Sequence, residues 1–202
     1  MKVSRKYKNY FVEIFDDSSF SQKTDSPTQY SKVYELEDDK DFESSAQHAI
    51  EIYDGDKQIA NAIILASNGA TSVTEDAILI HDDNLIVRCS NAIVSLTLPK
   101  LHLNWMTIAD PMTCFCIYQY QDSYITHGEL SICRIDKFGK IMWEFGGADI
   151  FLKLDGENCC KLADHSITIK DFGGTVYEID YNGKLLVTHN SMERKKPWWA
   201  YW

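Results

Sequence analysis

The chain has 202 residues, of which 45% are hydrophobic and 25% are charged, and its 30 acidic and 20 basic residues give a formal net charge of −10. This balance predicts a globular protein that can bury a sizeable core. Because an acidic chain repels phosphate backbones and anionic membrane surfaces, we expect neither nucleic-acid nor membrane binding. A basic protein partner is compatible with the sign of the charge.

Residues 1–12 have a basic start but no apolar core of signal-peptide length, and no run of about 18 apolar residues occurs in the chain. We therefore expect a cytoplasmic protein. Its six cysteines should then be reduced thiols. They are Cys89, Cys114, Cys116, Cys133, Cys159 and Cys160.

The first 48 residues mix strand-like and polar segments. Alternating side chains predict an opening strand at residues 3–15. The region 16–48 includes a polar, mobile loop, because its few apolar side chains bury too little surface to offset the entropy of ordering. Within this region we expect a short strand at 30–36 and one helical turn at 42–48.

From residue 49 onward, short alternating segments are separated by turn residues at intervals of eight to twelve residues, which is typical of sheets, sandwiches and propeller blades. The expected strands are 49–53, 59–65, 72–74, 77–81, 85–89, 93–98, 101–108, 113–120, 124–127, 130–135, 141–145, 150–154, 166–170, 175–180 and 184–188. The predicted fold class is all-β and mainly antiparallel, a meandering sheet, a sandwich or blade-like repeats with few or no helices. We expect one β-rich domain over residues 1–190, followed by an aromatic tail at 191–202.

The clearest hairpin spans residues 131–145, where the turn Asp136-Lys137-Phe138-Gly139 joins two alternating segments. Residues 176–186 repeat its Ile, Asp, Gly and Lys, and residues 93–105 end in a tryptophan, as the hairpin does at Trp143. Repeats spaced by roughly 40 residues are typical of propeller blades. Residues 93–188 thus resemble the blade repeats of quinoprotein-like β-propellers. The resemblance implies blade-like units, but two or three copies are too few to close a propeller.

The most enzyme-like residues are His127, Glu129 and Asp149. Histidine and carboxylate side chains can share proton transfer, and the adjacent glycines let a ligand approach the backbone. The alternative is structural, with Glu129 at a strand edge and Asp149 supporting a turn. The sequence contains no Gly-x-Ser-x-Gly elbow, phosphate loop, dinucleotide fingerprint or His-Glu-x-x-His motif, which favours a protein without catalysis.

The cysteine pattern also raises the question of a zinc site. Cys114 and Cys116, with the adjacent pair at 159–160 and His102 or His165, could supply ligands. Structural zinc sites usually contain two Cys-x2-Cys pairs, and this sequence has neither. We therefore expect buried free thiols, no bound metal and no cofactor.

The tail ends in Trp198, Trp199, Tyr201 and Trp202. Four aromatic side chains in the last five residues are unlike a solvated terminus, so we expect them to make an interaction. The expected alternatives are that they dock on the domain itself, cover a sheet edge or mediate self-association.

These observations favour a non-catalytic protein- or ligand-binding β module. One specific form is an acidic, immunity-type protein that neutralises a basic partner. The alternative is a small-molecule-binding protein or hydrolase-like enzyme that uses His127, Glu129 and Asp149.

Overall fold

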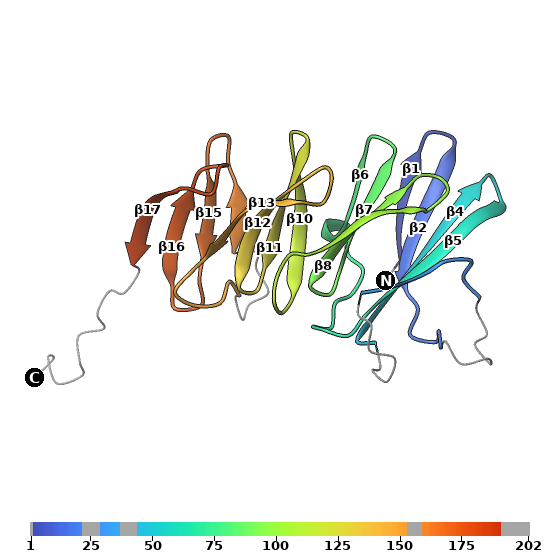
Figure 1. Ribbon diagram of the computed structural model, residues 1–202, viewed down its shortest axis with the longest axis horizontal. Coiled ribbons are helices and arrows are strands. Elements are labelled where there is room, and N and C mark those ends of the chain that lie inside the picture. The colour runs from blue at the N-terminus through green and yellow to red at the C-terminus, as the bar shows by residue number, and fades with distance from the viewer. Residues whose placement is uncertain (1, 22–28, 37–43, 153–158, 191–202) are drawn as a thin grey trace, which may run out of the picture.

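The computed structural model describes residues 2–21, 29–36, 44–152 and 159–190. These residues form four separate sheets that stand side by side in chain order (Figure 1). The pairing of β3 (Val33–Glu35) with β5 (Lys57–Ala66) is the one parallel pair among the described strands. The described helical structure is a single 3-10 turn, η1 (Glu75–Ala77). The predicted all-β, mainly antiparallel fold class is confirmed.

The first sheet has five strands in the order β1-β2-β4-β5-β3. Their bounds are β1 (Lys2–Tyr7), β2 (Tyr10–Asp16), β3 (Val33–Glu35), β4 (Ala46–Asp54) and β5 (Lys57–Ala66). The short strand predicted at 30–36 is confirmed as β3. The helical turn predicted at 42–48 is wrong for its described part, since β4 begins at Ala46 and buries alternate side chains from Ala46 through His48 and Ile50 to Ile52. That period of two suits a strand that lies between two others.

Each of the next three sheets is a meander of four consecutive antiparallel strands. The second contains β6 (Ile78–His81), β7 (Asn84–Cys89), β8 (Ala92–Thr97) and β9 (Leu103–Ile108). The third contains β10 (Cys114–Tyr120), β11 (Ser123–Gly128), β12 (Ser131–Asp136) and β13 (Ile141–Gly146). The fourth contains β14 (Cys160–Leu162), β15 (Ile167–Lys170), β16 (Thr175–Ile179) and β17 (Leu185–Asn190). Successive four-stranded meanders are the arrangement of propeller blades.

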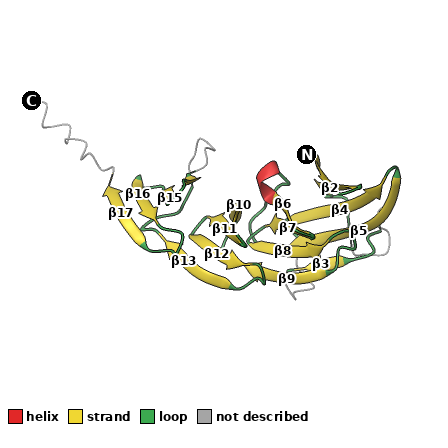
Figure 2. Ribbon diagram, turned by 90° about the horizontal axis from the view of Figure 1, so that it is seen from above, coloured by secondary structure: helices red, strands yellow, loops and turns green. Residues whose placement is uncertain are grey.

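The sheets pack face to face along a curved row, and β9, β13 and β17 lie along its convex side (Figure 2). Three layers of apolar side chains fill the spaces between neighbouring sheets. Ile50 and Leu85 belong to the first layer, and Ile86 and Ile135 to the second. Ile169 belongs to the third. Since each middle sheet contributes to two layers, both of its faces must be apolar.

Two tryptophans join neighbouring sheets at the convex side. Trp105 of β9 donates its indole N–H to the carbonyl of Lys137 in the third sheet, at 2.9 Å. Trp143 of β13 donates in the same way to the carbonyl of Tyr181 in the fourth sheet, at 3.0 Å. Both rings are half-buried, whereas Ile135 and Ile179 on the neighbouring strands are fully buried. The tryptophans therefore act at the seams between sheets.

The turns that receive these tryptophans have the same hydrogen bonds. In one, the Asp136 carboxylate accepts the backbone N–H groups of Phe138 (2.8 Å) and Lys140 (2.9 Å). In the other, Asp180 accepts those of Asn182 (2.8 Å) and Lys184 (2.9 Å). The repeated sequence therefore encodes a turn with a backbone carbonyl that accepts the indole N–H of a tryptophan in the preceding sheet.

Candidate functional site

His127, the most enzyme-like residue of the sequence, is buried between the third and fourth sheets with 3% of its surface exposed. Its Nε2 lies 3.0 Å from the carbonyl oxygen of Phe151 and 3.2 Å from the sulfur of Cys159. Burial lowers the pKa of His127, although the Phe151 carbonyl and the charge of Asp110 act in the opposite direction. The imidazole is thus a neutral group inside the protein at neutral pH.

Glu129 and Asp149 make contacts that are separate from those of the His127 side chain. The backbone of Phe151 links two of these positions, because its N–H donates to the carbonyl of Glu129 at 2.7 Å and its own carbonyl faces His127. The Asp149 carboxylate accepts the backbone N–H of Ile150 at 2.9 Å. In the described part of the chain, no hydrogen bond or ion pair connects the three side chains. The structure therefore does not connect the three candidate acid–base residues through their side chains.

None of the six cysteines forms a disulfide, and all six are buried. Burial raises the pKa values of Cys89, Cys133 and Cys160 to about 12, so these thiols are protonated and unreactive at neutral pH. Among the residues that the structure describes, no group of three or more His, Cys, Asp or Glu side chains is arranged to hold a metal ion.

Asp110 has a structural role that the sequence does not indicate, since Asp110-Pro111 resembles a simple break between strands. Its buried carboxylate accepts four backbone N–H groups, those of Met112 (2.7 Å), Thr113 (3.0 Å), Leu130 (2.8 Å) and Ser131 (2.8 Å). A Cβ added at Gly128 would lie 2.2 Å from this carboxylate. Asp110 therefore connects the end of the second sheet to the β11–β12 turn.

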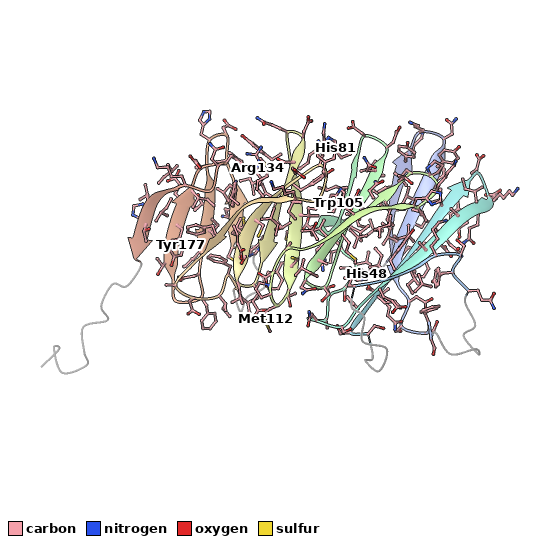
Figure 3. All side chains as sticks on the ribbon, viewed as in Figure 1. His48, His81, Trp105, Met112, Arg134 and Tyr177 are labelled. Carbon is pink, nitrogen blue, oxygen red and sulfur yellow. The ribbon has the colours of Figure 1, made fainter. Side chains whose placement is uncertain are left out.

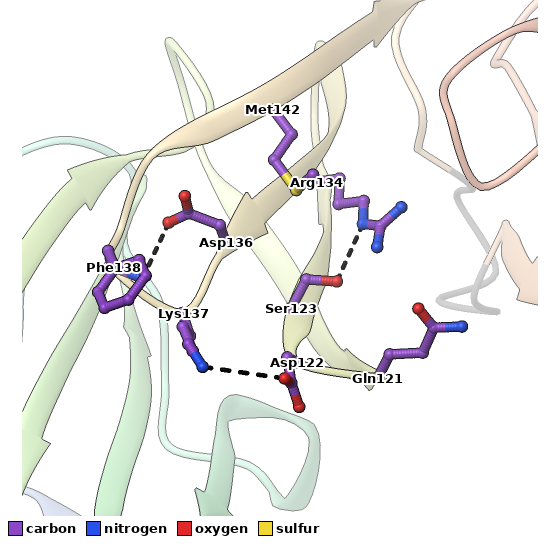
Figure 4. A pocket seen from close by; sticks show the side chains of 8 residues that line it. All are labelled: Gln121, Asp122, Ser123, Arg134, Asp136, Lys137, Phe138 and Met142. Carbon is purple, nitrogen blue, oxygen red and sulfur yellow. Dashed lines mark hydrogen bonds and ion pairs between the residues drawn. The ribbon is translucent and has the colours of Figure 1, made fainter.

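An open hollow of about 410 Å³ lies on the rim of the third sheet, between the β10–β11 and β12–β13 turns (Figure 4). We call it the rim hollow. Its lining combines both signs of charge with two apolar side chains. The lining residues are Gln121, Asp122, Ser123, Arg134, Asp136, Lys137, Phe138 and Met142.

Arg134 is held in one orientation inside the rim hollow. Its Nε donates to the hydroxyl of Ser123 and its Nη1 to the carbonyl of Tyr181, both at 2.9 Å. The guanidinium lies 4.8 Å from the centre of the Tyr120 ring, which stacks in parallel on Tyr181 at 3.8 Å. Figure 3 places Arg134 toward the edge of the molecule that carries the β10–β11 and β12–β13 turns. The hollow thus has a preorganised cation in its wall.

Phe138 and Met142 present apolar surface beside Arg134, with 73% and 52% of their surfaces exposed. Lys137 and Asp122 complete the edge as a loose ion pair at 3.9 Å. The turn that carries Phe138 is fixed by Asp136 and by Trp105, so this exposed ring is held on a rigid support. The sequence contains a signal for it, since the matching turn has Asn182 where this one has Phe138.

The aromatic tail residues predicted to interact, Trp198, Trp199, Tyr201 and Trp202, lie outside the described residues. Their role stays a prediction. In the described part of the chain, no helix is both long and apolar enough to cross a membrane.

The described fold is a curved array of blade-like sheets, the architecture found in β-propellers. No protein-family model matches the sequence, and no curated protein sequence matches it significantly. The fold is instead similar to solved structures. The computationally designed Ika8 protein matches 93% of this chain with 8% identity and a TM-score of 0.54, over 48% of its own length. The AfRom2 CNH domain matches 94% of this chain with 9% identity and a TM-score of 0.52, over 54% of its own length.

BamB from Moraxella catarrhalis matches 71% of this chain with 10% identity and a TM-score of 0.48, over 43% of its own length. The chain therefore spans about half the length of the solved structures that it matches. The TM-scores of the Ika8 protein and the AfRom2 CNH domain show a similarity of fold alone. The resemblance to propeller blades is confirmed at the level of four-stranded units, and the quinoprotein-like family itself stays a prediction.

Proposed function

We propose that this chain is a non-catalytic protein-binding module whose partner contacts Phe138 and the rim hollow. The observation that carries the proposal is the difference between two turns with the same hydrogen bonds, one of which presents Phe138 to water while the other presents Asn182. Asparagine is favoured in such turns, and an apolar ring exposed to water gains no burial energy. Folding does not explain Phe138, whereas binding does.

The surroundings of Phe138 suit a protein interface. Aromatic residues, methionine and arginine are enriched at the centres of interfaces, and Met142 and Arg134 lie beside Phe138 in the hollow. Because Asp136 and Trp105 already hold the turn, little conformational entropy remains to be lost when a partner binds. Lys137 and Asp122 supply a polar edge that a partner can pair with.

The net charge of −10 supports a basic partner, since opposite charge speeds encounter and disfavours acidic competitors. An immunity-type protein that neutralises a basic protein is a specific form of this proposal. It rests on charge and size alone. The cytoplasmic location expected from the sequence is part of the same proposal.

The test uses Phe138→Asn, which introduces the residue of the matching turn and so preserves the fold. Tagged wild-type and variant chains are incubated with native lysate, and captured proteins are quantified by mass spectrometry. We expect a basic protein that the wild type retains and the variant loses at least tenfold, with an unchanged melting temperature. The matched control is Phe172→Asn, because Phe172 is also exposed (50%) and follows Asp171 in an Asp-x-x-Gly turn. Identical capture by the wild type and Phe138→Asn would refute the proposal.

The alternative, a small-molecule-binding protein or hydrolase-like enzyme using His127, Glu129 and Asp149, stays a prediction. The burial of His127 and its contacts with Phe151 and Cys159 support it less well than a binding role. Hydrolysis of a panel of nitrophenyl esters by the purified protein, lost in Glu129→Gln, would favour it.

A further inference from the structure

β17 is an exposed, uncharged edge strand. All of its described side chains are exposed, and Leu185, Leu186 and Val187 expose 46%, 48% and 37% of their surfaces. Its outer edge has no strand partner in the described part of the chain. The strand Leu185–Asn190 contains no Asp, Glu, Lys or Arg. Its backbone N–H and C=O groups are therefore open to another strand.

Natural proteins usually protect such edges with lysine, proline or a covering segment. The edge strand β1 of the first sheet follows this rule, since it carries Lys2, Arg5 and Lys6. β17 carries three consecutive aliphatic residues instead. The edge strand β9 of the second sheet is also uncharged, but its Trp105 contacts the next sheet, which β17 does not do with a tryptophan.

The tryptophan hydrogen bond that joins neighbouring sheets is not repeated at β17. Trp105 pairs with Ser95 and Trp143 pairs with Arg134, each beside a register shift, and Val187 pairs with Glu178 at the equivalent place. Valine has no indole N–H to donate. The strand register also puts Glu178, Thr168 and Lys161 on the same face as Val187, so that face of the fourth sheet is largely polar. The uncovered apolar surface is therefore at the edge, where strand pairing occurs.

We infer that β17 pairs antiparallel with the β17 of a second copy of this chain in a register centred on Val187, so that two fourth sheets form one eight-stranded sheet. A two-fold contact requires a surface that is complementary to itself, and an uncharged aliphatic strand meets that requirement. The new pairing continues the order β14-β15-β16-β17 without a break. Lys184 is the nearest charged residue before the strand. Because the pairing is antiparallel, Lys184 of one copy lies beside the C-terminal end of β17 in the other copy. The two Lys184 side chains are then separated by about 20 Å, beyond the distance at which exposed charges interact at physiological salt.

The first test measures mass by sedimentation equilibrium over a range of protein concentrations. We expect a reversible dimer of the full chain, and at least a tenfold weaker dimer for Val187→Lys, which places two ammonium groups side by side. Val187→Thr is the matched control, because threonine is also β-branched and uncharged, and it should dimerise like the wild type. An unchanged melting temperature at a concentration where the wild type is monomeric shows that Val187→Lys still folds.

The second test uses a unique surface thiol. Because all six native cysteines are buried, Val187→Cys should cross-link rapidly to a dimer under mild oxidation. Met112→Cys is the control, since Met112 is more accessible than Val187 (52% against 37% exposed) and lies in the link between β9 and β10, outside the fourth sheet. A monomer at all concentrations would overturn the inference, as would a dimer that Val187→Lys does not weaken. So would a dimer that dissociates only when residues 198–202 are removed. Failure of this contact leaves the Phe138 proposal intact, because the latter is tested by partner capture.

Discussion

The indole of Trp105 occupies the space that a side chain at residue 139 would need. A Cβ built on Gly139 would lie 2.7 Å from the Trp105 ring, and the Gly139 backbone has a φ of +87°. The relationship recurs one sheet later, where a Cβ on Gly183 would lie 2.7 Å from the ring of Trp143. Each tryptophan thus fits against a glycine of the next sheet, and the fit sets how neighbouring sheets are spaced.

Gly139→Ala should therefore destabilise the protein by about 3 kcal/mol, since it combines an unfavourable positive φ with displacement of Trp105. Gly55→Ala is the matched control, because Gly55 also has a positive φ (+58°) but nothing within 4 Å of its added Cβ. The control should cost about 1–2 kcal/mol. Chemical denaturation measures both, and equal losses would show that Trp105 readily moves away.

Asp110→Asn should lower the free energy of unfolding by about 2–4 kcal/mol, because an amide cannot accept all four of the backbone N–H groups that the carboxylate accepts. Asp122→Asn is the control. Its side chain is 82% exposed and its ion pair is loose, so we expect a change below about 0.5 kcal/mol. Denaturant titration would contradict the assigned role if both variants were equally stable.

The lowered pKa of His127 predicts a specific dependence of stability on pH. In the unfolded chain the imidazole takes up a proton near pH 6.5, whereas burial holds the folded pKa lower. The unfolded state therefore binds more protons between these two values. Stability from this group is complete above about pH 6.5 and is lost as the pH falls toward the folded pKa.

His127→Gln removes that titration, so its free energy of unfolding should fall less than that of the wild type between about pH 7 and about pH 5. His102→Gln, which changes an exposed histidine, is the matched control. Denaturation series at several pH values supply the comparison. Parallel curves for the wild type and His127→Gln would mean that His127 is not held neutral.

Removal of residues 198–202 should lower the melting temperature or the oligomer mass, because four aromatic side chains in five residues are unlike a solvated terminus. Differential scanning calorimetry and light scattering measure the two quantities. If neither changes, the aromatic tail has no structural or self-association role.

Much of the fold is determined locally by the sequence. Period-two alternation predicts most strands, and the turn Asp136-Lys137-Phe138-Gly139 and its echo at Asp180 predict the two hairpins whose hydrogen bonds are identical. These features depend on backbone conformation and on neighbours within a few residues, so a single sequence can reveal them. The roles of His127, Glu129, Asp149 and the tail remain predictions.

Only the tertiary structure decides how the strands are grouped into sheets and which side chains stay exposed for binding. The same alternation serves a continuous sheet, a sandwich or separate blades, because it specifies buried faces but not what covers them. The contact of Trp105 with Gly139 joins residues of different sheets, and no local pattern encodes it. Phe138 and Val187 become candidates for binding because the packing of the sheets leaves the Phe138 ring and the described side chains of β17 in water.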